Sequence, residues 1–151
     1  MIERIRRALL SLALTALPAL ACAGAPTVSD AWARATPPGV DVGAAYLTIT
    51  GGSANDRLVR VSTDRATMAQ LHVTGESNGV ATMRPVDGIP VPAGKRVVLA
   101  PKGTHVMLMG LARPLVAGET FPLVLRFEAT GEQTVQVTVR AAGDAGPPAP
   151  H

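Results

Sequence analysis

Two histidines and four methionines lie within 42 consecutive residues of this 151-residue chain: His72, His105, Met68, Met83, Met107 and Met109. Imidazole nitrogen and thioether sulfur are neutral donors, and thioether favours Cu(I) over Zn(II), Mg(II) or Ca(II). Taken singly, each residue has an ordinary structural interpretation, since methionine fills gaps in protein cores. The spacing of the residues therefore has to decide whether they form a site.

The first candidate pair is His105 and Met107. Residues two apart on a strand point to the same face, so a strand over 104–109 presents both side chains together. Met109 shares that face but lies about 13 Å from His105 at 3.3 Å per residue. Gly110 permits a bend there, which leaves Met109 as a second-rank candidate.

The second candidate pair is His72 and Met83. Strands over 67–74 and 80–84, joined by a turn centred between Ser77 and Asn78, would place this pair directly opposite, with Cβ atoms about 5 Å apart. A shift of one residue would break this pairing. Met68 lies about 13 Å along the strand from His72 and is expected in the core or at its rim.

Two imidazoles and two thioethers predict a site for Cu(I), or for Ag(I) as its mimic. A zinc site would favour Cys, His or carboxylate ligands. A blue-copper electron-transfer site requires a Cys thiolate, and the only cysteine is Cys22. We therefore expect an ion that need not change its oxidation state.

The elements that position these residues are expected to be strands. Val135, Val137 and Val139 alternate with polar residues in 132–140, and apolar residues alternate in 120–128. Further strands are expected at 43–50, 57–63, 67–74, 80–84, 95–100 and 104–109, separated by Gly-, Pro- and Asn-containing turns. This pattern predicts an all-β domain, an antiparallel sandwich or Greek-key barrel.

The N-terminal residues 1–23 have the pattern of a secretory signal peptide, with a basic start, an apolar stretch and Ala21-Cys22-Ala23 before the cleavage site. Its removal lowers the net charge from +3 to +1, which leaves no basic footprint for nucleic acid. The alternatives are a short N-terminal membrane anchor and lipidation at Cys22; once the signal is removed and without lipidation, no membrane attachment is expected. The copper-binding β domain is expected over 24–140, and a disordered Ala/Gly/Pro-rich tail over 141–151.

The ligand spacing is specific: His72, ten residues, Met83, twenty-one residues, His105, one residue, Met107. This resembles the periplasmic copper(I) chaperones of the PCuAC type, whose hallmark is His-x10-Met-x21-His-x-Met. The flanking segments 30–34, 44–48, 56–59, 83–86 and 104–111 are also similar to that family. The resemblance covers about residues 28–139.

The resemblance implies that His72, Met83, His105 and Met107 are the copper ligands of a cupredoxin-like Greek-key β-barrel. It also implies a periplasmic protein that carries Cu(I) to an acceptor for assembly of a cytochrome c oxidase copper centre. The acceptor would be an oxidase subunit or a Sco-type assembly factor. Val73 stands where the family often has a further Met, and the tail offers only His151 toward a Cu(II) site.

A different class of function stays open at this point. The chain could be a periplasmic β-sandwich interaction module with a Met-rich partner surface and no physiological metal. An enzyme is not expected, because only His72 and His105 are available in the folded body to serve a Ser/His/Asp arrangement. We expect a monomer.

Overall fold

The computed structural model describes residues 24–146, and this part of the chain consists of strands without a helix. The strands are β1 (Thr27–Arg34), β2 (Val42–Thr50), β3 (Asp56–Ser62), β4 (Ala66–Ser77), β5 (Val80–Pro85), β6 (Ile89–Val91), β7 (Arg96–Leu99), β8 (His105–Leu111), β9 (Thr120–Phe127) and β10 (Gly131–Arg140). The all-β prediction is confirmed. Eight strands fall close to the expected ranges, whereas β1 and β6 were not expected from the sequence.

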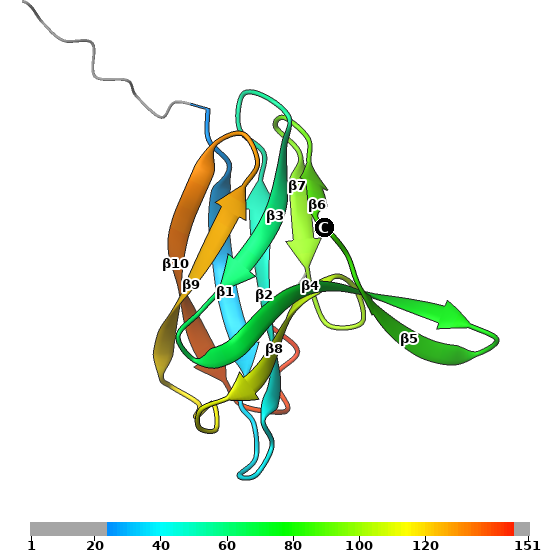
Figure 1. Cartoon of the computed structure of the whole chain (residues 1–151), viewed down its shortest axis with the longest axis vertical. Helices are drawn as coiled ribbons and strands as arrows, with labels where there is room; N and C mark the ends of the chain where they lie inside the picture. Colours follow the sequence, from blue (N-terminus) through cyan, green and yellow to red (C-terminus); the bar gives the residue numbers. More distant parts are fainter. Residues whose placement is uncertain (1–23, 147–151) are drawn as a thin grey trace, which may run out of the picture.

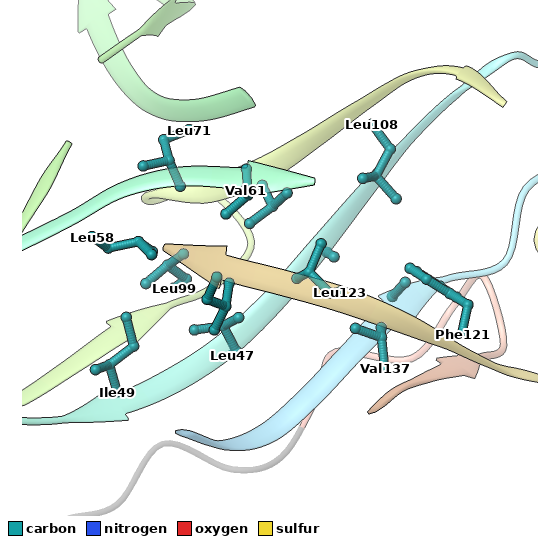
Figure 2. Close-up of a cluster of buried hydrophobic side chains, with 14 of the residues drawn as sticks. Leu47, Ile49, Leu58, Val61, Leu71, Leu99, Leu108, Phe121, Leu123 and Val137 are labelled. Atoms are coloured by element: carbon teal, nitrogen blue, oxygen red, sulfur yellow. The ribbon is translucent and has the colours of Figure 1, made fainter. Parts of the chain in front are cut away.

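All ten strands belong to one sheet with the order β5-β4-β8-β2-β1-β10-β9-β3-β6, and β7 pairs with β2 off this path. The pairs are antiparallel except β1 with β10, which is parallel. The strands at the two ends of the path, β5 and β6, do not pair with each other in the described residues, so the sheet is not closed. The sheet curves around one core, to which β2, β3, β8 and β9 all contribute (Figure 2).

The core explains which face of each strand points inward. Phe121, Leu123, Leu125 and Phe127 of β9 are at most 2% exposed, as the alternation in 120–128 predicts. Burial of each such side chain contributes roughly 1.5–3 kcal/mol. In β8 the buried Val106 and Leu108 point into the same core, which directs the alternate residues of β8 to the opposite face.

The β4–β5 hairpin projects from the body of the domain (Figure 1). Its turn is Asn78-Gly79, and both residues have positive φ, 52° and 76°, as a two-residue type I′ turn requires. The turn is thus centred one residue later than expected, and Met83 pairs with Thr74 rather than with His72. The expected direct His72–Met83 pairing is wrong, because the Asn-Gly dipeptide sets the register.

Strand β1 was not predicted from the sequence because its residues do not alternate regularly. Its register shifts between Ser29 and Trp32, and Asp30 has φ 53°, so a bulge interrupts the alternation.

The expected tail begins where β10 ends. Part of it, 141–146, lies against the domain: Arg34 donates to the carbonyl of Asp144 at 3.3 Å, and a side chain at Gly146 would collide with the ring of Trp32. The domain boundaries stay a prediction, because the signal peptide, Cys22 and His151 lie outside the described residues. Within the described range, no helix has the length and apolar character to span a membrane.

Candidate metal centre

The two candidate histidines face each other across neighbouring strands. In the antiparallel β4–β8 ladder, His72 is the direct partner of His105. Their ring centroids are 5.9 Å apart with an angle of 42° between the planes. Residues separated by 33 positions in the sequence are thus brought together by strand pairing alone.

His105 is the buried member of the pair, with 4% of its surface exposed. Its Nδ1–H donates to the carbonyl of Gly103 at 3.0 Å, and the ring of Tyr46 lies 6.5 Å away between centroids. The same Gly103 carbonyl accepts the backbone N–H of Thr74 at 3.3 Å. With Nδ1 protonated and occupied, Nε2 keeps its lone pair for a metal ion.

His72 is half-buried and is held by its neighbour on the same face of β4. Nε2–H of His72 donates to Oε1 of Gln70 at 3.2 Å. Its Nδ1 is buried and has no hydrogen-bond partner in the described part of the chain. Burial, and then the proximity of His105, lower the pKa of His72. The neutral, metal-binding form of this imidazole is therefore favoured.

Met107 lies on the histidine face of β8, two residues from His105. Its direct neighbours in the sheet are Gln70 on β4 and Ala44 on β2. Met107 is half-buried, and it lines the same groove as Ala44. The expectation that His105 and Met107 project together is consistent with this arrangement.

Met83 approaches the cluster from the projecting hairpin. It lies opposite Thr74, and Thr74 shares the face of His72 because the two are two residues apart. Met83 is thus a diagonal neighbour of His72, for which typical separations are about 7–8 Å. Its side chain is 61% exposed. Met83, His105 and Met107 all line one groove of about 560 Å³.

The two remaining methionines form a separate pair. Met68 and Met109 are direct partners in the β4–β8 ladder. They lie four residues along their strands from His72 and His105, a separation of roughly 13 Å. Strand β8 continues past Gly110 to Leu111. The second-rank candidate Met109 is therefore not brought to the histidine pair.

The donor set decides which ion could be held here. In the described residues, no three side chains of the His, Cys, Asp and Glu types come together as a possible metal site. The soft donors nearest this histidine pair are the thioethers of Met83 and Met107, which line the same groove as His105. This combination fits Cu(I) and does not fit Zn(II) or Ca(II).

Comparison with known proteins identifies the family. Residues 26–139 match the family described as "Putative lipoprotein LpqE-like". The chain belongs to the LpqE-like family. A relative in Leifsonia xyli subsp. xyli, "Putative lipoprotein Lxx21020", is 38% identical over 114 residues, which cover 75% of this chain and 68% of the relative.

The LpqE-like chain also resembles solved PCuAC domains. The copper-bound PCuAC domain from PmoF2 is 27% identical with a TM-score of 0.67, over 79% of this chain and 95% of that one. Apo-DR1885 from Deinococcus radiodurans is 35% identical with a TM-score of 0.62, over 95% and 97%. CuI-DR1885 is 34% identical with a TM-score of 0.60, over 84% and 81%. The resemblance to the PCuAC-type family and the cupredoxin-like fold are thereby confirmed.

Three supporting residues of this LpqE-like domain were missed by the sequence reasoning: Gln70, Tyr46 and Gly103. Gln70 could have been found, because it lies two residues before His72 and so shares its face. Tyr46 and Gly103 carry no such signal. Their contacts with His105 depend on the approach of β2 and on the turn before β8.

Proposed function

We propose that this protein is a copper chaperone that binds one Cu(I) ion through His72, Met83, His105 and Met107 and passes it to an acceptor protein. The observation that carries this proposal is the direct cross-strand pairing of His72 with His105. It supports a site in which two imidazole nitrogens act together with two thioethers, and within residues 24–146 no cluster of three His, Cys, Asp or Glu side chains competes for the ion.

The exposure of the ligands supports carriage of the ion rather than permanent retention. His105 is almost fully buried, whereas Met83 is 61% exposed on the projecting hairpin. Ligand exchange with an acceptor would begin at Met83, because its thioether is a weak, neutral ligand and the one most open to solvent. His72 and His105 would hold the ion until the acceptor's ligands replace them.

The proposed setting is the periplasm, and the proposed acceptor is a cytochrome c oxidase subunit or a Sco-type assembly factor. The signal-like residues 1–23 and the lipoprotein names of the family and its relative support a location in the cell envelope. The acceptor follows from the PCuAC resemblance and is tested by transfer, not by binding.

The proposal is tested by a Cu(I) competition titration against a chromogenic chelator under reducing conditions. We expect one Cu(I) per chain, and loss of this binding when His72 and His105 are both replaced by Ala. Unchanged affinity in both His105→Ala and Met83→Ala would overturn the ligand assignment. Transfer is then followed by mixing the loaded protein with a purified oxidase copper-site domain.

A further inference from the structure

A groove of about 560 Å³ opens beside the candidate metal centre. We call it the Tyr46 groove. It lies between the β1–β2 loop and the β4–β5 hairpin, and its lining is predominantly apolar, including Pro37, Val40, Val42, Tyr46, Ala81 and Met83. Val40 and Val42 are 42% and 37% exposed. Apolar side chains that converge on a groove of this size are typical of a binding site.

The charged residues that line the Tyr46 groove are of one sign. They are Arg34 and Lys102, and no Asp or Glu is among the described residues that line it. Within the described range, neither cation has a carboxylate in ion-pair distance. Arg34 donates from Nη2 to the carbonyl of Asp144, but its Nε is buried without an acceptor. A ligand that carries a carboxylate would complement both cations.

The Tyr46 groove reaches three of the four candidate metal ligands. Met83, His105 and Met107 are part of its lining. Whatever occupies the groove therefore lies against the open side of the candidate copper site, where Met83 is the most exposed ligand. An occupant that supplies donors for ligand exchange would reach the ion from this direction.

We propose that the Tyr46 groove is the docking site for an extended acidic segment of a partner protein, with apolar side chains against Val40 and Tyr46 and a carboxylate near Lys102 and Arg34. As the docking site of the copper acceptor, this deepens the proposed function and rests on it. The binding of such a segment, however, requires no metal, and it can be tested separately.

The test uses metal-free protein and two synthetic pentapeptide amides, acetyl-Leu-Asp-Leu-Glu-Leu and acetyl-Leu-Lys-Leu-Lys-Leu, followed by amide shifts in two-dimensional NMR. We expect the acidic peptide to shift resonances of the groove lining, and the basic peptide to bind more weakly. Lys102→Glu should lower the affinity for the acidic peptide about 5-fold at low salt. Added salt should make this difference in affinity smaller. Val40→Ser should also lower the affinity for the acidic peptide.

Matched controls separate the groove from general surface effects. Lys95→Glu makes the same charge change on an exposed lysine outside the groove, and Val98→Ser makes the same apolar change at a valine that is 45% exposed. Neither should alter binding. The proposal is overturned if the acidic peptide does not bind, if the two peptides bind equally, if the shifts lie outside the groove, or if the controls match the test variants.

A Cu(I) titration of Lys102→Glu is expected to give the same affinity as the unsubstituted protein. Absence of copper binding alone would refute the proposed function, not the docking of the peptide.

Discussion

His72 and His105 are direct partners in the β4–β8 ladder, with ring centroids 5.9 Å apart. The two imidazoles differ in their hydrogen bonds. His105 donates from Nδ1 to the Gly103 carbonyl, and His72 donates from Nε2 to Gln70. One ring nitrogen of each histidine is therefore held by a hydrogen bond before any ion arrives, and the first two predictions rest on these hydrogen bonds.

The tautomer of His105 predicts which nitrogen it uses. Because Nδ1–H is committed to the Gly103 carbonyl at 3.0 Å, Nε2 should be the metal-binding atom. Long-range ¹⁵N–¹H NMR of the metal-free protein should show Nδ1 protonated, and Cu(I) should shift the Nε2 resonance strongly. A Cu(I)-induced loss of the Nδ1 proton would contradict this assignment.

Gln70 is predicted to act as a positioning residue for His72. Gln70→Leu removes the acceptor at 3.2 Å and should weaken Cu(I) binding by about 10- to 100-fold, the range typical of supporting contacts at metal sites. Gln70→Glu keeps an acceptor oxygen and should restore the affinity. The readouts are competition titration and the ¹⁵N shifts of His72; equal behaviour of the two variants would argue against this role.

The two exposed methionines of the hairpin strands should behave differently. Met83 and Met68 are 61% and 50% exposed, but only Met83 lines the groove beside His105 and Met107. Met83→Ala should weaken Cu(I) binding at least about 10-fold, whereas Met68→Ala should leave it unchanged. If both substitutions have the same effect, a general Met-rich surface explains the data better than a site.

The extent to which the sequence predicted this arrangement differs between the ligand pairs. Residues two apart on one strand share a face whatever the neighbouring strands are. The spacing of His105 and Met107 was therefore sufficient to predict that their side chains lie on the same face. The predicted direct pairing of His72 with Met83 was wrong. The type I′ turn at Asn78-Gly79 centres the hairpin one residue later than predicted, so that Met83 pairs with Thr74. The shift moves the partner by two positions, so Met83 keeps the predicted face.

The pairing of His72 with His105 could not be predicted from local patterns. It depends on which strand lies beside β4, and that is a property of the sheet order β5-β4-β8-β2. The core faces of β9 and β10, in contrast, follow directly from their alternation. Strand β1 was missed because a bulge at Ser29–Trp32 breaks the two-residue period.

An ion-pair cluster of Arg65, Arg113 and Glu119 should contribute to acid stability. The hydrogen bond from Arg65, then the Val116 N–H and Arg113, lower the pKa of Glu119 from 4.5 to about 2. A lowered folded-state pKa stabilises the fold above the unfolded value. That contribution is lost as the pH falls from about 4.5 through about 2.

Glu119→Gln should therefore lower the free energy of unfolding at pH 7 by about 1–3 kcal/mol and flatten its pH dependence between pH 4.5 and 2. Urea unfolding followed by the fluorescence of Trp32, the single tryptophan, measures both quantities. Glu128→Gln, at an exposed glutamate, is the control and should change neither. A steep acid dependence that persists in Glu119→Gln would assign the effect to other carboxylates.

The central claim is that two imidazoles and two thioethers hold one Cu(I) ion, and X-ray absorption at the copper edge tests it most directly. In the Cys22→Ala variant the protein has no cysteine, so every protein sulfur scatterer must come from methionine. We expect two nitrogen and two sulfur neighbours per copper, with the sulfur count reduced in Met83→Ala and in Met107→Ala. A copper environment of nitrogen and oxygen alone would contradict it.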